Sequence, residues 1–98
     1  MATGSARAEA SVATTSPERY AKQLAAHLGR RCEIVEEGDA TRIITGSGEC
    51  LVRSTPGILE LHATAATPED LEQVMHVVGS HLERFGQRNE LTVTWRKG

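Results

Sequence analysis

The chain has 98 residues, of which 39% are hydrophobic, 24% charged and 3% aromatic, a composition typical of one globular domain with an aliphatic core. A net charge of −2 and a pI near 6.1 argue against a nucleic-acid binder, and no apolar run approaches the roughly 18 residues of a membrane helix. The N-terminus lacks the apolar segment of a secretory signal, and the only cysteines are Cys32 and Cys50, so we expect a cytoplasmic protein without a disulfide framework.

The N-terminal third of the chain predicts a tail, a strand and a helix. Residues 1–7 are small and polar and predict a flexible tail, which leaves residues 8–98 as one domain. Residues 8–12 alternate small apolar with polar side chains, a weak pattern that favours an edge strand. The segment 16–29 predicts an amphipathic helix with Ser16 as its N-cap.

Four short runs with turn residues between them follow that helix. They cover residues 32–36, 41–45, 49–54 and 58–64. Gly46-Ser47 and Pro56-Gly57 suit tight turns between consecutive antiparallel strands. Only one face of these strands is strongly apolar, which indicates an antiparallel sheet that is covered on one side.

The strongest element is a helix predicted over residues 67–86, with Thr67 as N-cap, Pro68 in the first position and Gly86 as its stop. The sequence LTVTW at 91–95 alternates apolar residues with threonines and predicts a final strand. This element order predicts an α+β fold, in which a single-layer antiparallel sheet of five or six strands carries two helices on one face.

Two stretches carry motifs of one bacterial family. TSPERYAKQLAAH supplies the first set, Tyr20, Lys22, Gln23, Leu24 and His27. HLERFGQRNELTVTW supplies the second set, His81, Arg84, Phe85, Arg88, Glu90, Leu91 and Trp95. In these motifs, and over roughly residues 8–96, the chain resembles domain of unknown function 2218. It departs from the family pattern at Gly86, where Ala is usual, and at Gln87, where an apolar residue is common.

The resemblance implies a fold and an association. Such domains look like the C-terminal domain of phosphohexomutases, with helices on one side of an antiparallel sheet. The family has no established activity. Some members lie beside, or are fused to, flavin-dependent siderophore reductases, which implies a link to iron handling and a reductase as protein partner.

A candidate polar cluster joins the two helices. His81 falls at the edge of the apolar stripe of its helix, and His27 lies one turn from Leu24 on the other helix, so the two imidazoles could approach each other. Tyr20 and Arg84 lie on the same two helices and complete the candidate cluster. The alternative is structural: each histidine binds a nearby backbone or carboxylate group and holds its helix in place, and this interpretation is favoured.

Metal and catalytic sites are less well supported. His27, His81, Cys32 and Cys50 are suitable ligand types, but they come from four separate elements, and nothing in their spacing requires them to converge. A Cys50–His81 pair lacks a signature for an oxyanion hole, so the sequence assigns no catalytic residue and no cofactor.

The turn VRSTPG is a candidate anion site. The resemblance to phosphohexomutases implies a phosphate-binding loop at this place, for which Arg53, Ser54 and Thr55 would be the donors. The loop is short and lacks the acidic-Pro pair that follows in those enzymes. A plain Pro-Gly hairpin turn with a solvent-facing Arg53 is therefore the favoured interpretation.

The sequence leaves three functions open. The leading one is a non-catalytic accessory or interaction module, with the siderophore reductase as the implied partner. The second is a domain that binds a small anion or a phosphate ligand, and the third is a metal-binding protein that uses His27 and His81. Edge strands leave open whether the chain is a monomer or a homodimer.

Overall fold

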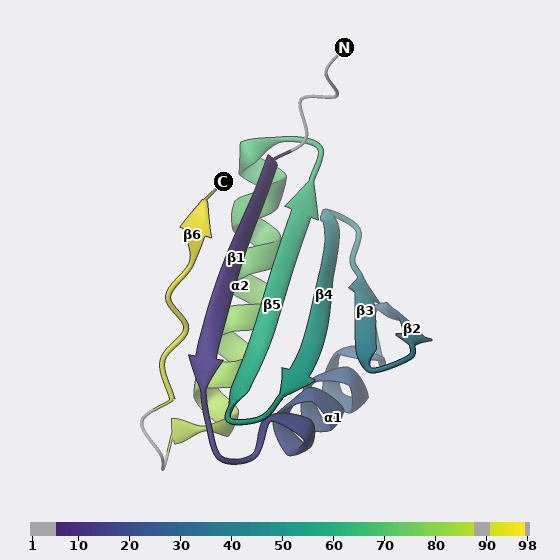
Figure 1. The fold of residues 1–98 in the computed structure, drawn as a ribbon. Helices are drawn as coiled ribbons and strands as arrows, with labels where there is room; N and C mark the ends of the chain where they lie inside the picture. The colour runs from purple at the N-terminus through teal and green to yellow at the C-terminus, as the bar shows by residue number, and fades with distance from the viewer. Residues whose placement is uncertain (1–5, 88–90, 98) are drawn as a thin grey trace.

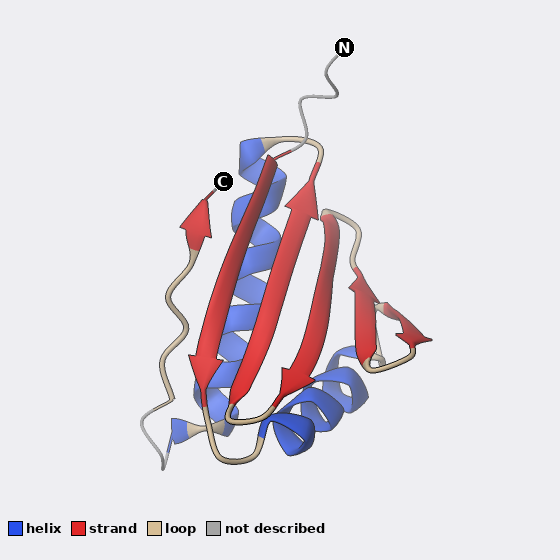
Figure 2. Ribbon diagram, viewed as in Figure 1, coloured by secondary structure: helices blue, strands red, loops and turns tan. Residues whose placement is uncertain are grey.

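The computed structural model describes residues 6–87 and 91–97. Within those residues, six strands form one antiparallel sheet in the order β2-β3-β4-β5-β1-β6, and two helices pack on one of its faces (Figure 1, Figure 2). The elements are β1 (Ala6–Ala13), α1 (Pro17–Leu28), β2 (Glu33–Glu37), β3 (Ala40–Ile44), β4 (Gly48–Thr55), β5 (Ile58–Ala65), α2 (Pro68–Phe85) and β6 (Arg96–Lys97). The predicted α+β class is confirmed.

The hydrophobic core lies between the sheet and the two helices. Side chains alternate between the faces of a strand, so every second residue of β1 and β5 faces the helices. α1 covers β3, β4 and β5, whereas α2 covers β1, β4 and β5. Leu24 of α1, Leu82 of α2 and Leu61 of β5 have no exposed surface. Within residues 6–87 and 91–97, neither helix is long and apolar enough to cross a membrane.

Two glycines set the geometry of the β2–β3 and β4–β5 turns. Gly38 and Gly57 have φ angles of 67° and 76°, a region that glycine occupies at little cost because it lacks a Cβ. At the β4–β5 turn, Pro56 and Gly57 leave Thr55 paired with Ile58 across the hairpin. The predicted Pro-Gly turn is therefore present.

The two helices begin differently, although both were expected to have a side-chain cap. The Thr67 hydroxyl accepts a hydrogen bond from the Asp70 amide at 3.1 Å, as predicted for the N-cap of α2. Ser16 occupies the N-cap position of α1, but its side chain makes no capping bond. Instead, the Ser16 amide donates to the Thr14 hydroxyl at 3.1 Å, so the residue before the helix is fixed by the preceding turn.

The predicted strand at 91–95 is wrong. These residues are not in the sheet. Of the described residues 91–97, only Arg96 and Lys97 pair with β1, opposite Glu9 and Ala8. Leu91 is buried, and Val93 and Trp95 pack against the core.

Gly79 in α2 and Gly86 directly after it explain where this terminal segment packs. A Cβ at Gly86 would lie 2.4 Å from that of Leu91, and one at Gly79 would lie 3.1 Å from the Trp95 ring nitrogen. The segment therefore approaches α2 closely because these positions lack side chains. The alternation of LTVTW reflects packing against that helix.

The predicted place of β1 in the sheet also needs correction. β1 was expected at an edge, but it lies between β5 and β6. It begins at Ala6, so Ala6 and Arg7 are paired with β5 and not part of a tail. The remainder of the predicted tail, residues 1–5, lies outside the described residues.

Candidate functional site

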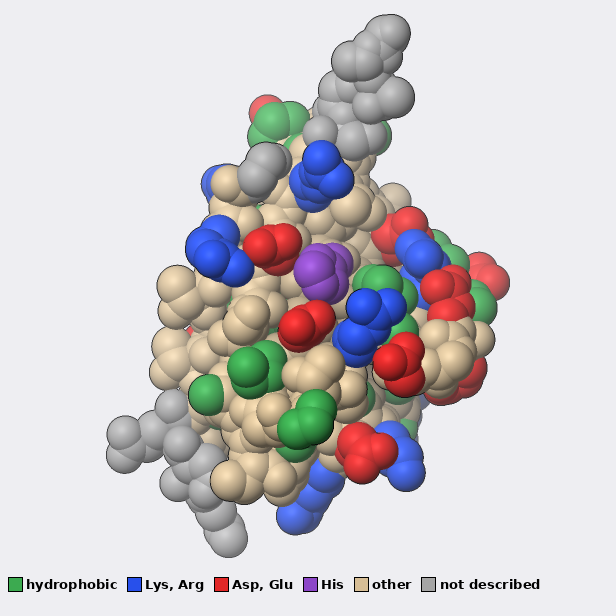
Figure 3. Space-filling model, in the orientation of Figure 1, with side chains coloured by type: hydrophobic (Ala, Val, Ile, Leu, Met, Phe, Trp, Pro, Cys, Tyr) green, Lys and Arg blue, Asp and Glu red, His purple; other side chains and the backbone are tan. Residues whose placement is uncertain are grey.

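The face of the sheet away from α1 and α2 is not covered by any other described element (Figure 3). We call it the open face. It carries Arg96 of β6, the odd-numbered side chains of β1, β2 and β4, and the even-numbered side chains of β3 and β5. The strand register places one row across all six strands, consisting of Val35, Arg42, Leu51, His62, Glu9 and Arg96.

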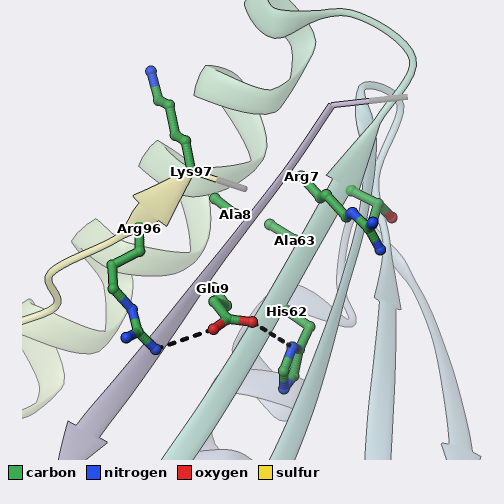
Figure 4. A pocket seen from close by; sticks show the side chains of 8 residues that line it. Arg7, Ala8, Glu9, His62, Ala63, Arg96 and Lys97 are labelled. Atoms are coloured by element: carbon green, nitrogen blue, oxygen red, sulfur yellow. Dashed lines mark hydrogen bonds and ion pairs between the residues drawn. The ribbon is translucent and has the colours of Figure 1, made fainter. Parts of the chain in front are cut away.

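Glu9 lies between two basic groups at one end of this row (Figure 4). One of its carboxylate oxygens is 3.0 Å from Arg96 Nη2, and the other is 3.8 Å from His62 Nδ1. The second ring nitrogen of His62 is 3.7 Å from Glu60 Oε1. Glu9, His62 and Arg96 line an open hollow of about 480 Å³, together with Arg7 and Lys97. The remaining lining residues, Ala8, Ala63 and Thr64, are small, so the hollow has charged side chains around it and no large apolar one.

Arg42 joins three strands near the opposite end of the row. Its Nε is 2.7 Å from a Glu37 oxygen on β2, and its Nη1 is 2.9 Å from both Glu49 oxygens on β4. The hydrogen bond from Arg42 lowers the pKa of the Glu37 carboxyl, and both carboxylates raise the pKa of Arg42. The result is a surface network of permanent charges.

Charge is distributed unevenly over the open face. On the β1–β6 side, Arg7 and Arg96 outnumber Glu9. On the β2–β3 side acidic side chains predominate, as Figure 3 shows at the right of the molecule. These acidic side chains are Glu33, Glu37, Asp39 and Glu49. The face therefore has a basic side and an acidic side, and a charged surface would bind it in one preferred orientation.

The predicted histidine cluster lies on the helix side of the molecule. The ring centroids of His27 and His81 are 4.9 Å apart. His27 also makes an edge-to-face contact with Phe85, with ring centroids 5.5 Å apart. His81 Nδ1 is 2.6 Å from the carbonyl oxygen of Val77, one turn earlier in α2. His81 is half-buried and His27 is exposed. The two imidazoles therefore meet at the contact between α1 and α2.

Tyr20 and Arg84 were predicted to belong to the same cluster. Tyr20 is buried in the core beneath α1. Arg84 is exposed, and together with His81 it lines a shallow hollow at the end of α2. The structure thus brings Arg84 near one histidine and places Tyr20 in the hydrophobic core. Arg88 and Glu90, from the second family motif, lie outside the described residues.

The two cysteines do not join the histidines. Cys50 has no exposed surface and faces the core from β4, and burial raises the pKa of its thiol to about 12. Cys32 is half-buried and packs at the edge of the core. Among residues 6–87 and 91–97, no three His, Cys, Asp or Glu side chains are grouped so that they could hold a metal ion. A thiol like that of Cys50 is unreactive at neutral pH.

The side chains of the three predicted anion donors do not point to one place. Arg53 lies on the open face, where its Nε is 3.7 Å from Asp39 Oδ1. Ser54 is the next residue along β4, so its side chain is directed to the helix side. The Thr55 hydroxyl donates to the Ile58 carbonyl at 3.1 Å within the turn. The turn therefore presents one cation that is already paired with a carboxylate, and not three converging donors.

Comparison with known proteins assigns the chain to a family. A model described as "Uncharacterized protein conserved in bacteria (DUF2218)" matches residues 9–96. The chain belongs to this family. It is similar to the structure titled "NMR structure of PA4090 from Pseudomonas aeruginosa", with 24% sequence identity, a TM-score of 0.77, and coverage of 93% of this chain and 95% of that one. No curated protein matches the sequence.

Sequence reasoning missed the charged row of this DUF2218 domain. The alternation in β5 places His62 opposite the apolar face. It does not show which residues flank His62, because Glu9 and Arg96 reach it only through the pairing of β1 with β5 and β6. Such long-range pairing leaves no trace in local spacing. The outward position of a lone histidine in a strand was the only signal available.

Proposed function

We propose that this domain is a non-catalytic interaction module that binds a partner protein through its open face. The observation that carries the proposal is a whole sheet face left uncovered by the described elements, with a basic side, an acidic side and a hollow next to Glu9 and His62. Half-buried Leu51 lies in its central row and supplies apolar contact area. Charged groups that surround a small apolar centre are typical of a protein interface.

The size of the face suits a transient complex. Strands lie about 4.8 Å apart and rise about 3.3 Å per residue, so the five longer strands present roughly 500 Å². A stable interface of standard size buries about 800 Å² on each partner. We therefore expect a transient complex, with an association rate that falls as salt is added.

The proposed partner is a flavin-dependent siderophore reductase. The family resemblance implies this partner through gene neighbourhood and fusion. In this proposal the reductase supplies the chemistry, and the domain positions the reductase or modulates its activity.

The proposal is tested by titrating a purified reductase of this class from the same bacterium with the domain in a calorimeter. The informative variant combines Arg7→Glu with Arg96→Gln, which removes the basic side of the open face. The control combines Arg19→Glu with Arg30→Gln on exposed positions of the helix side and produces the same change in net charge. We expect the first variant to weaken binding about tenfold or more and the control to bind like the parent chain.

Two results would contradict the proposal. If the parent chain does not bind the reductase, the partner is wrong. If it binds and both double variants weaken binding equally, the open face is not the binding surface. Circular dichroism of each variant separates these results from a loss of fold.

A further inference from the structure

His27 and His81 form a pair of imidazoles from two different helices. His27 lies in the last turn of α1, His81 lies one turn before the end of α2, and their ring centroids are 4.9 Å apart. We propose that this pair binds a divalent first-row metal ion, with Zn²⁺ as the reference case. The inference concerns the helix side of the molecule and does not rest on the function proposed for the open face.

The distance between the rings suits a shared ion. A Zn–N bond of about 2.1 Å places the metal about 3.2 Å from the centroid of each ring, so two imidazoles on one tetrahedral ion have centroids about 5 Å apart. The observed separation is 4.9 Å, and the rings are tilted by 50° rather than stacked in parallel. Neither ring centre therefore has to move far for both nitrogens to reach one ion.

The tautomer of His81 suits a ligand. Its Nδ1 is 2.6 Å from the Val77 carbonyl. A carbonyl only accepts hydrogen bonds, so Nδ1 is the protonated nitrogen and donates to it. In the neutral ring, Nε2 then carries the lone pair that a metal requires. A backbone carbonyl that holds the non-ligating nitrogen is a common arrangement behind metal-bound histidines.

The surroundings keep the pair in place and leave it accessible. Phe85 packs against both rings, at 5.5 Å from His27 and 6.2 Å from His81. His27 is exposed, and the negative end of the α1 dipole favours a cation in that last turn. Two charged residues of α2 line the same shallow hollow as His81: Arg84, which is exposed, and Glu83, whose carboxylate accepts a hydrogen bond from the Val93 amide at 3.0 Å.

Two protein ligands define the character of the site. No third His, Cys, Asp or Glu among the described residues joins the pair, so water or an external ligand would complete the coordination shell. Such a site exchanges its ion readily, unlike a closed structural zinc site with four protein ligands. Imidazole ligands favour zinc, nickel, copper and cobalt over magnesium and calcium.

The test is calorimetric titration of the tag-free chain with ZnCl₂ at a pH where imidazole is neutral. The variants are His27→Gln and His81→Gln, and the control is His76→Gln, which changes an exposed histidine of α2. We expect one ion per parent chain, a loss of affinity of about tenfold or more in each of the two variants, and no change in the control. Imidazole NMR signals of His27 and His81 should shift during the same titration.

The proposal is overturned if the parent chain binds no Zn²⁺, or if His27→Gln binds it as tightly as the parent. It is also overturned if His76→Gln loses as much affinity as the other two variants, because binding would then be nonspecific. His81→Gln removes the bond to Val77 and can loosen α2. The exposed His27 provides the decisive variant because its replacement leaves the core intact.

Discussion

The two faces of the sheet are made from the same strands but differ in what they contain. The covered face carries aliphatic side chains that α1 and α2 remove from water, and among the described residues it includes no buried charged group. The open face carries acidic and basic side chains, with Arg42 paired to Glu37 and Glu49, and Glu9 placed between Arg96 and the His62 ring. Burial of apolar area stabilises a fold, whereas exposed ion pairs add little. We infer that the covered face maintains the fold and leaves the open face available for recognition.

The largest expected effect is the difference in stability between two leucine substitutions, one on each face of the sheet. Leu82→Ala removes a fully buried side chain of α2 and should lower the free energy of unfolding by about 3 kcal/mol. Leu51→Ala changes a half-buried residue of the open face and should cost less than about 1 kcal/mol. Urea denaturation of both variants measures the difference. Equal losses would show that the open face also belongs to the core.

Removal of a helix cap should have a smaller effect on stability, and the N-cap residues of the two helices provide a matched pair of substitutions. Thr67→Ala removes the hydroxyl that accepts from Asp70 and should cost about 1 kcal/mol. Ser16→Ala removes a hydroxyl that makes no capping bond, so its cost should be a few tenths of a kcal/mol at most. Thermal unfolding followed by circular dichroism compares the two variants. A larger loss for Ser16→Ala would contradict the capping described for α1 and α2.

The smallest expected effect is a change in the titration of Glu37. Arg42 lowers the pKa of this carboxyl in the folded chain, chiefly by its hydrogen bond. A carboxylate of this kind contributes stability above its unfolded pKa and loses it as the pH falls through the lower folded pKa. Arg42→Gln should therefore raise the Glu37 pKa toward the ordinary value, as measured by NMR of the side-chain carboxyl carbon. An unchanged pKa would mean that the pair is not formed in solution.

The sequence was a good guide to local structure and a poor guide to the neighbours of each strand. Period-two alternation predicted the strands up to residue 64, and Thr67 and Gly57 marked a helix start and a turn correctly. LTVTW shows the same alternation, but its apolar residues pack on α2 beside Gly79 and Gly86. Alternation reports that one side of an extended segment is buried, and it does not identify what buries it.

The two candidate sites differ in the same way, because local geometry predicts one of them and strand pairing determines the other. Helical periodicity placed His27 and His81 near the helix contact, because both lie beside apolar stripes whose direction is fixed by local geometry. The row from Val35 to Arg96 could not be predicted, because it depends on the pairing of strands that are far apart in the chain. Register between such strands is set by the whole sheet and by the turns.

The most direct test of the central claim is methyl NMR of the domain while the reductase is added. If the open face is the recognition surface, the methyl signals of Leu51, Ile44 and Ile58 should shift or broaden. Those of Val77 and Met75, which lie half-buried on α2, should remain unchanged. Shifts confined to the α2 methyl groups would place the interface on the helix side and contradict the division of roles between the two faces.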